Sequence, residues 1–326
     1  MEIRQLAQEL GLPLDNLLAA EPNGTEMFAC FDGDPYSYKE ATRDLKAIWQ
    51  KIHKDVVAAG YPTTYYESTA RGRELDQMSI IDWINESVPG GMGSKLGQLL
   101  DVAYNIEYGE ESSQQSALNL LYQLGYSGQG QLRIFGPSNE KYHVRGGNDQ
   151  IPQRLAAALA GQIRYAHSLT AVERKMDGSY ALTFLNGGNN VQVNAGRVVL
   201  ALPFSILRSS VDLTQAGFQP LKMTAILEQG MGANSKFHLQ FKTRHWAALG
   251  CNGDTYADTG YQNTWEVTRG QAGTPGILVN YTGGDVARAA DKTSAATVLQ
   301  RVEPVLPGLT AEFNGKTQLE YWPGNP

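Results

Sequence analysis

Closely spaced metal ligands are missing from this sequence. Its 326 residues include only two cysteines, Cys30 and Cys251, which lie far apart and in no CxxC pair. The five histidines show no ligand spacing, and there is no HExxH pattern. A zinc site is not expected, because such sites need clustered Cys and His ligands. We expect both cysteines to be free and buried, with one disulfide as the alternative.

Long apolar runs and basic blocks are missing as well. The longest apolar stretches, such as Val198–Leu202, are far too short to span a bilayer. The N-terminus places charged and apolar residues at helical spacing, unlike a signal peptide. The net charge is −6, without the basic cluster that nucleic-acid binding requires. We therefore predict a cytoplasmic protein with neither a membrane segment nor a nucleic-acid partner.

Three glycine-containing stretches come close to known motifs without meeting them. Gly125–Gly128 lacks the glycine spacing of GxSxG. In the loop that ends at Lys95, the next residue is Leu96, where a phosphate loop needs Ser or Thr. Gly230–Gly232 precedes a strand pattern instead of opening a helix, so it fails the dinucleotide fingerprint. The residues alone indicate only a globular α+β protein.

The chain is long enough for two domains of ~150 residues, and its pattern changes twice, near residues 128 and 217. The first block is helical, with apolar residues at spacings of three and four over residues 39–59. Gly60-Tyr61-Pro62 ends that helix, as glycine followed by proline commonly does.

The later blocks are richer in strands. In the middle block we predict a helix over residues 149–159 and a continuous apolar strand buried on both faces over 197–201. The other strands predicted in this block cover residues 162–165, 169–175, 180–185 and 191–193. In the last block we predict strands over residues 236–241, 262–268, 277–281 and 317–322, with helices over 220–228 and 294–305.

Four landmarks follow one another over about residues 135–250. Tyr142–Leu155 reads as a short strand that ends in Gly-Gly and runs into a helix, and Ile163–Gly178 reads as a strand followed by a hairpin. Arg197–Leu207 contains an apolar run that ends in proline, and Ser235–Trp246 carries a lysine on a strand before a tryptophan. In this order the landmarks resemble the flavin-containing amine oxidases, a superfamily that includes monoamine, L-amino-acid and polyamine oxidases.

The resemblance implies a mixed α/β, two-domain, FAD-linked fold. Residues 1–137 would form the helical part of the substrate domain, 138–218 a middle segment of the FAD-binding domain, and 219–326 the substrate-domain sheet. The family's glycine-rich loop and C-terminal FAD segment have no counterpart here. We therefore expect an incomplete fold that binds FAD poorly by itself. It would be a truncated product, an incomplete gene prediction, or half of a split enzyme whose other chain carries the missing segments.

The resemblance also implies roles for particular residues. Lys236 matches the family's lysine that reaches the flavin ring and holds a water near its reactive nitrogen, where a positive charge would favour reaction with oxygen. The residues implied to bind FAD are Gly146, Gly147, Leu169, Ala201, Pro203 and Trp322. Tyr261 and Trp265 would line the substrate cavity, although a packing role suits both.

The implied reaction is oxidation of an amine or amino acid C–N bond. FAD would take up the hydride equivalent, the imine would hydrolyse to a carbonyl and ammonia, and molecular oxygen would reoxidise the flavin with release of hydrogen peroxide. Two alternatives stay open. One is a non-catalytic binding module that keeps only the substrate lobes. The other is a flavoprotein of the desaturase or protoporphyrinogen oxidase type, for which we would expect an apolar tunnel instead of an aromatic, partly polar pocket.

Overall fold

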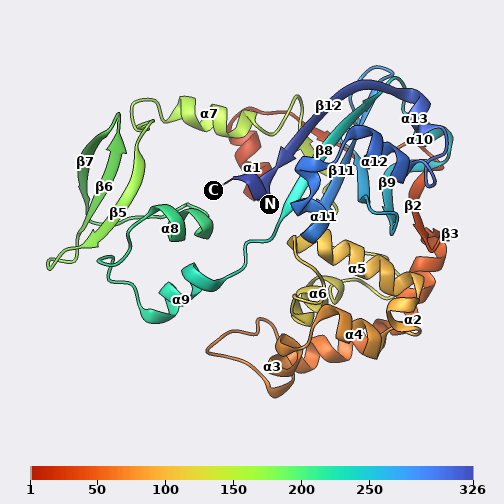
Figure 1. Cartoon of the computed structure of the whole chain (residues 1–326), viewed down its shortest axis with the longest axis horizontal. Coiled ribbons are helices and arrows are strands. Elements are labelled where there is room, and N and C mark those ends of the chain that lie inside the picture. The colour runs from red at the N-terminus through yellow and green to blue at the C-terminus, as the bar shows by residue number, and fades with distance from the viewer. Residues whose placement is uncertain (1, 326) are drawn as a thin grey trace. The chain divides into compact units, whose positions relative to one another are not determined.

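The computed structural model describes residues 2–325, which divide into two compact units (Figure 1). Within the described residues, the first unit comprises 2–14 and 144–231, and the second comprises 15–143 and 232–325. Each unit is therefore built from separated stretches of the chain. The short strands β1 (Leu14–Asn16) and β4 (Tyr142–Val144), which pair with each other, fall where the chain passes between units.

A seven-stranded sheet forms the centre of the second unit, in the order β12-β8-β11-β10-β9-β2-β3. Neighbouring strands are antiparallel except for β2 and β9, which are parallel. The strands are β2 (Glu26–Phe31), β3 (Asp34–Ser37), β8 (Asn234–Phe241), β9 (Cys251–Ala257), β10 (Gln262–Glu266), β11 (Gly276–Gly283) and β12 (Phe313–Tyr321).

The two faces of this sheet differ in burial. Residues of β8 alternate strictly between half-buried and buried, and Phe237, Leu239 and Phe241 point into an apolar core. Residues of α12 (Ala295–Val302) and α13 (Leu309–Glu312) complete that core. The shorter elements nearby are α10 (His245–Ala248), α11 (Gly284–Arg288), η2 (Ala290–Lys292) and η3 (Trp322–Gly324). Cys30 and Cys251 are both free and buried, which confirms the expectation of two buried thiols.

The second unit also contains a helical block that gathers beyond one end of the strands (Figure 1). Its helices are α2 (Tyr38–Ala59), α3 (Ala70–Gln77), α4 (Ile80–Ser87), η1 (Gly91–Gly93), α5 (Lys95–Tyr108) and α6 (Ala117–Leu124). The helix predicted over residues 39–59 is confirmed. It begins with a capping box between Ser37 and Glu40 and ends at Gly60, whose N–H bonds to the carbonyl of Val56.

Helix α5 approaches the sheet at a point where only glycine fits. The backbone of Gly283, at the end of β11, packs against the Asn105 carbonyl of α5. The Asn105 amide oxygen accepts from Gln262 Nε2 at 3.0 Å, and Gln262 Oε1 accepts from the Gly283 N–H at 2.9 Å. This buried hydrogen-bond chain fixes the helical block against the strands.

We expect Gly283→Ala to destabilise the second unit by about 1–3 kcal/mol, the usual cost of overpacking a well-filled interior. A Cβ at this position would overlap the Asn105 carbonyl, which cannot move without dragging α5. Chemical denaturation of the native protein and of Gly283→Ala would measure this loss of stability. Gly93→Ala is the matched control, because a Cβ there has no neighbour within 4 Å. Equal stability of the two variants would contradict this account of the α5 contact.

The first unit is the smaller of the two. Its antiparallel meander consists of β5 (Ser168–Arg174), β6 (Tyr180–Asn186) and β7 (Asn189–Ala195), as the hairpin pattern predicts. Its helices are α1 (Glu2–Glu9), α7 (Gln150–Ala158), α8 (Phe204–Ser210) and α9 (Pro220–Glu228). A small core forms between the meander and helices α8 and α9, whereas α7 has no buried residue.

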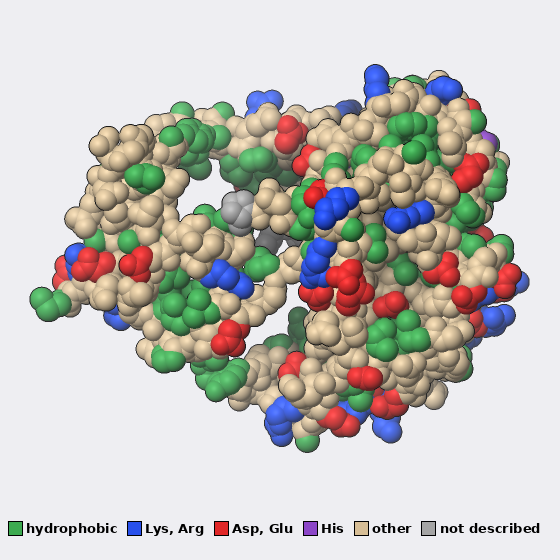
Figure 2. Space-filling model, in the orientation of Figure 1, with side chains coloured by type: hydrophobic (Ala, Val, Ile, Leu, Met, Phe, Trp, Pro, Cys, Tyr) green, Lys and Arg blue, Asp and Glu red, His purple; other side chains and the backbone are tan. Residues whose placement is uncertain are grey.

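The strands predicted over residues 162–165 and 197–201 are wrong. Both segments lack strand structure, and Val199 is 90% exposed although the pattern predicts burial on both faces. Val198 and Leu200 do turn inward onto the small core. Within the described residues no neighbouring strand bonds to these segments, so their outward side chains stay at the surface. Figure 2 shows hydrophobic side chains on the surface of this unit.

Candidate functional site

Lys236 lies at the centre of an aromatic cluster on the half-buried face of the sheet. Strand β8 places it directly opposite Tyr281 of β11. The Lys236 Nζ atom lies 5.2 Å from the ring centroid of Trp265, 5.3 Å from that of Tyr281 and 5.7 Å from that of Trp322. Each ring is close enough for a cation–π interaction with the ammonium group. We call Lys236, Trp265, Tyr281 and Trp322 the lysine cluster.

The sheet register explains how this cluster assembles. Trp265 of β10 pairs with Val279, two residues before Tyr281, so the two aromatic residues share one face. Their rings pack edge to face, with centroids 5.2 Å apart and an interplanar angle of 73°. Trp322 comes from η3 after the edge strand β12 and is 44% exposed. The cluster therefore has a rigid wall on the sheet and an accessible side.

Burial controls the ionisation of these groups. It lowers the pKa of the Lys236 ammonium, and the Glu140 carboxylate opposes that shift. Burial also raises the pKa of Tyr281 to about 12, with smaller contributions from Glu107 and Glu140. Lys236 therefore gives up its proton more readily than an exposed lysine, while Tyr281 keeps its hydroxyl proton at neutral pH.

Tyr261 lies apart from this cluster. It is fully buried in the core on the other face, and its hydroxyl donates to Thr255 Oγ1 at 2.8 Å. The structure thus brings together Lys236, Trp265 and Trp322, and it adds Tyr281, which the sequence interpretation missed. The available signal was strand pairing, because any residue opposite Lys236 on a neighbouring strand shares its face.

The remaining predicted FAD-binding residues belong to the first unit. Gly146 and Gly147 have φ values of 86° and 123°, so the turn before α7 requires glycine. Leu169 lies on β5, paired with Phe184 and packed against the small core. Ala201 is exposed, and Pro203 is the residue before α8. These positions supply an accessible backbone turn and apolar surface.

These residues match one end of a flavin cofactor better than the other. The lysine cluster offers a cation and flat aromatic surfaces, which suit a flavin ring. A pyrophosphate needs a glycine-rich loop that opens a helix, and the sequence contains no GxGxxG. The residues described above therefore fit the ring of FAD, but they do not provide a glycine-rich loop for its pyrophosphate.

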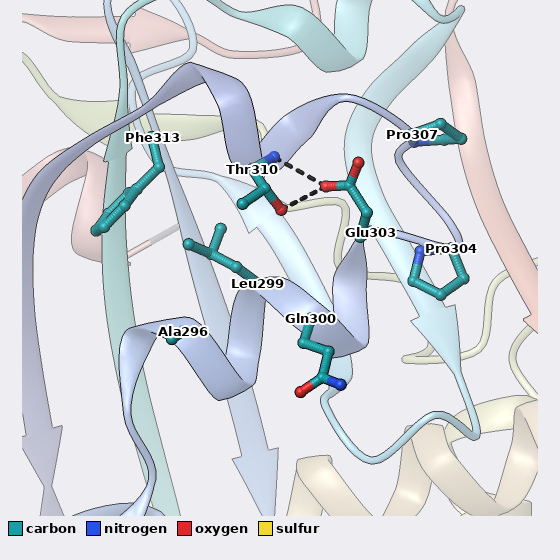
Figure 3. A pocket seen from close by; sticks show the side chains of 8 residues that line it. All are labelled: Ala296, Leu299, Gln300, Glu303, Pro304, Pro307, Thr310 and Phe313. Atoms are coloured by element: carbon teal, nitrogen blue, oxygen red, sulfur yellow. Dashed lines mark hydrogen bonds between the residues drawn. The ribbon is translucent and has the colours of Figure 1, made fainter.

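A hollow in the second unit lies away from the lysine cluster (Figure 3). It measures about 520 Å³ and is mainly apolar. Its lining comes from α12, α13, the loop between them and the first residue of β12: Ala296, Leu299, Gln300, Glu303, Pro304, Pro307, Thr310 and Phe313. The Glu303 carboxylate accepts from Thr310 and from the Gly308 N–H. The one charged group of this hollow is thus engaged in fixing the α12–α13 loop, and Leu299 and Phe313 join the core opposite the lysine cluster.

Family comparison identifies the class of protein. The sequence model of the family described as flavin containing amine oxidoreductase matches residues 2–322. The chain therefore belongs to the flavin-containing amine oxidoreductases, and FAD is the cofactor that this family implies.

Two curated relatives are individually similar to the chain. An L-amino acid dehydrogenase of Synechocystis sp. is 28% identical over 134 residues, covering 41% of this chain and 27% of the relative. The flavin-dependent L-tryptophan oxidase RebO of Lentzea aerocolonigenes is 28% identical over 170 residues, covering 50% of this chain and 34% of the relative. The matched region spans about a third or less of each relative.

Solved structures show the same mixed α/β fold. Putrescine oxidase bound to putrescine matches with a TM-score of 0.77 and 19% identity, covering 98% of this chain and 71% of that chain. Cyclohexylamine oxidase from Brevibacterium oxydans matches with a TM-score of 0.75 and 14% identity, covering 98% and 70%. Within residues 2–325, no helix combines the length and apolar character needed to cross a membrane.

Proposed function

We propose that this chain forms the substrate-binding part and a portion of the FAD-binding domain of a flavin-dependent oxidase. The proposed reaction is oxidation of the C–N bond of an amine or amino acid, with oxygen as the electron acceptor. Family membership supports the flavin chemistry. The observation that carries the proposal is the lysine cluster, which sets a partly buried cation against three aromatic rings, two on one sheet face and the third on η3.

The bound flavin would supply the hydride acceptor, and the chain would supply position and charge. Trp265 and Tyr281, packed edge to face, form an aromatic wall against which an amine substrate can lie. Lys236 places a positive charge where reduction of oxygen develops negative charge, an arrangement that favours that step electrostatically. Its lowered pKa also lets it hold or release a proton at Nζ.

The character of the wall favours an amine over the alternative substrates. Across the sheet from Tyr281, the register places Asn263 and Tyr256 on the same face, but both are buried and do not reach the accessible side of the cluster. The accessible side of the lysine cluster is aromatic and carries a cation, whereas a desaturase or protoporphyrinogen oxidase would need an apolar tunnel. A non-catalytic binding module would use the same wall but would have no need of the partly buried Lys236.

We further propose that the first unit is completed by strands supplied from outside residues 1–326, in the same polypeptide or a separate chain. Residues 197–201 alternate, with Val198 and Leu200 inward and Val199 and Ala201 exposed. This pattern leaves apolar side chains of the segment without a covering layer on their outer side. The greater length of the similar solved structures is consistent with such a layer.

Flavin retention tests both proposals. We expect residues 1–326 alone to retain little FAD, and a protein extended by a segment carrying a glycine-rich loop to show a bound flavin band that bleaches with an amine or amino acid. Val199→Asp should abolish retention in the extended protein, and Met176→Asp, at a fully exposed turn of the same unit, should not. Retention by residues 1–326 alone would refute the need for completion. If the extended protein never binds flavin, its assignment as a flavin-dependent oxidase is refuted.

A further inference from the structure

Several asparagines of the chain directly precede a glycine, and the reaction outlined above gives these pairs no role. The pairs are Asn23-Gly24, Asn186-Gly187, Asn252-Gly253 and Asn314-Gly315. An asparagine before glycine can lose its side-chain amide without an enzyme, because glycine has no side chain to keep its backbone nitrogen away from the asparagine carbonyl carbon. Since the reacting residues are the same in each pair, the fold decides which pairs react.

Hydrogen bonds hold the amide of two of these asparagines inside the fold. Asn252 is only 8% exposed, and its Oδ1 accepts from the Asp254 N–H at 2.9 Å. Asn186 is half-buried, and its Nδ2 donates to the Ala166 carbonyl at 2.9 Å. Each amide must leave its partner before its carbonyl carbon can turn toward the glycine nitrogen, so both pairs are protected.

Asn314 shows protection by hydrogen bonding alone. Its side chain is exposed at the surface of β12. Its Nδ2 nevertheless donates to Gln240 Oε1 at 2.9 Å, and its Oδ1 accepts from the Lys316 N–H at 3.1 Å. Both ends of this amide are therefore fixed, although water reaches it.

Asn23 is exposed at the tip of a turn before β2. The Thr25 N–H donates to the Pro22 carbonyl at 3.3 Å, which closes a β-turn with Asn23 and Gly24 at its centre. Gly24 has a φ of 79°, and a Cβ added there would meet nothing within 4 Å. Within residues 2–325, the Asn23 side chain has no hydrogen-bond partner. The central peptide of a β-turn makes no hydrogen bond inside the turn, so both reacting groups are free.

We propose that Asn23 is a site of spontaneous modification, at which the asparagine converts to aspartate and isoaspartate. The Gly24 nitrogen attacks the side-chain carbonyl carbon of Asn23, and the new N–C bond closes a cyclic imide. The Cγ–Nδ2 bond breaks, and Nδ2 leaves as ammonia with the proton that the glycine nitrogen gives up. Water then opens the imide at either of its carbonyls, and the two openings give aspartate and isoaspartate.

The position of Asn23 gives this change a structural consequence. Glu21 of the same loop accepts from Arg269 Nη1 at 3.1 Å, and the Glu26 N–H, at the start of β2, donates to the Gly250 carbonyl at 3.0 Å. Aspartate adds a negative charge two residues from Glu21, and isoaspartate lengthens the backbone inside the turn. We therefore expect faster hydrogen exchange at the Glu26 amide in the converted protein.

Mass spectrometry of the purified chain tests the proposal independently of flavin. The chain is incubated in mildly alkaline buffer, which favours loss of the glycine amide proton. Peptides that contain Asn23 should convert roughly ten-fold faster than those of the other pairs, because a hydrogen bond of ordinary strength must first break there. The same chain in denaturant should convert all pairs at comparable rates. Gln240→Leu, which removes one partner of Asn314, should speed conversion at Asn314 and leave the rate at Asn23 unchanged.

The rates in the unaltered chain decide the question even if Gln240→Leu does not fold. Equal conversion of all pairs in the folded chain would overturn the proposal. An Asn23 that keeps its amide in the folded chain, while the denatured chain converts, would overturn it too. Asn23→Gln needs a larger ring to react, so its loss of the product from this peptide alone would confirm the site.

Discussion

Replacing Asp55 with alanine is expected to lower the free energy of unfolding of the second unit by about 3–5 kcal/mol, the usual cost of removing one partner from a buried ion pair. Asp55 lies on α2 and its side chain is 4% exposed. One carboxylate oxygen accepts from Arg71 of α3, at 3.1 Å from Nε and 3.0 Å from Nη2. The other accepts from Trp83 Nε1 of α4 at 3.0 Å and lies 3.2 Å from Lys51 Nζ.

The size of the effect follows from what the substitution leaves behind. Trp83 is fully buried, so its indole N–H would lose the acceptor that it has among the described residues, without access to water. Arg71 and Lys51 are 21% and 33% exposed and can partly rehydrate. Glu74→Ala is the matched control, because it removes the 60%-exposed partner of the same Arg71 and should cost under about 1 kcal/mol. Equal losses of unfolding free energy in Asp55→Ala and Glu74→Ala would show that Asp55 does not link helices α2, α3 and α4.

The same residue gives a pH signature. Burial alone would raise the pKa of Asp55, but the hydrogen bonds from Trp83, Lys51 and Arg71 and the Lys51 charge outweigh it and hold the pKa below its ordinary value. A depressed pKa stabilises the fold above the unfolded-state value of about 3.9, and that stability is lost as the pH falls through the folded-state value. We therefore expect the difference in unfolding free energy between the native protein and Asp55→Asn, measured by denaturation, to be largest at neutral pH and to vanish in acid.

Local sequence signals were sufficient for the helices. Helix α2 has an apolar stripe, a capping box at Ser37 and a glycine at its end, so every signal agrees with the tertiary outcome. The meander was equally predictable, because its hairpin turns are short and its strands alternate. In these cases the contacts that stabilise an element lie within a few residues of it.

Long-range pairing was not predictable in the same way. Strand β9 carries polar residues such as Asn252 and Asp254, and it forms a strand because β10 and β2 bond to it from either side. Residues 197–201 are the opposite case. Their apolar run suits a strand, but they form none because no described neighbour pairs with them. Propensity expresses what a segment can form, whereas sheet membership depends on a partner that is distant in sequence.

In the candidate site, too, local features were predictable from the sequence and long-range pairing was not. The alternation along β8 puts Lys236 and His238 on the half-buried face and Phe237 in the core on the other. It could not show that Tyr281 lies across from Lys236, because that depends on the β8–β11 register. Tyr261 and Trp265 are four residues apart in sequence yet lie on different faces of the sheet, since Tyr261 precedes the first residue of β10.

Replacing Lys236 with methionine in a flavin-loaded protein is expected to slow reoxidation by oxygen about 100-fold, the loss typical when one preorganised charge-stabilising group is removed. Methionine keeps the length and much of the apolar stem, so Trp265 and Tyr281 retain a packing partner. Reduction by the amine substrate should change far less, because Lys236 is proposed to act on oxygen and not on the C–N bond. Stopped-flow measurement of each half-reaction separates these two effects.

Lys316→Met is the matched control, since Lys316 is an exposed lysine of the neighbouring strand β12 and lies outside the lysine cluster. It removes the same charge from the protein but not from the aromatic rings, so both half-reactions should keep their rates. A purely structural Lys236 would instead slow reduction and reoxidation together, and would lower flavin retention. If Lys236→Met and Lys316→Met reoxidise equally fast while both hold flavin, the charge at Lys236 has no part in the reaction with oxygen, and the lysine cluster then serves only to shape the substrate wall.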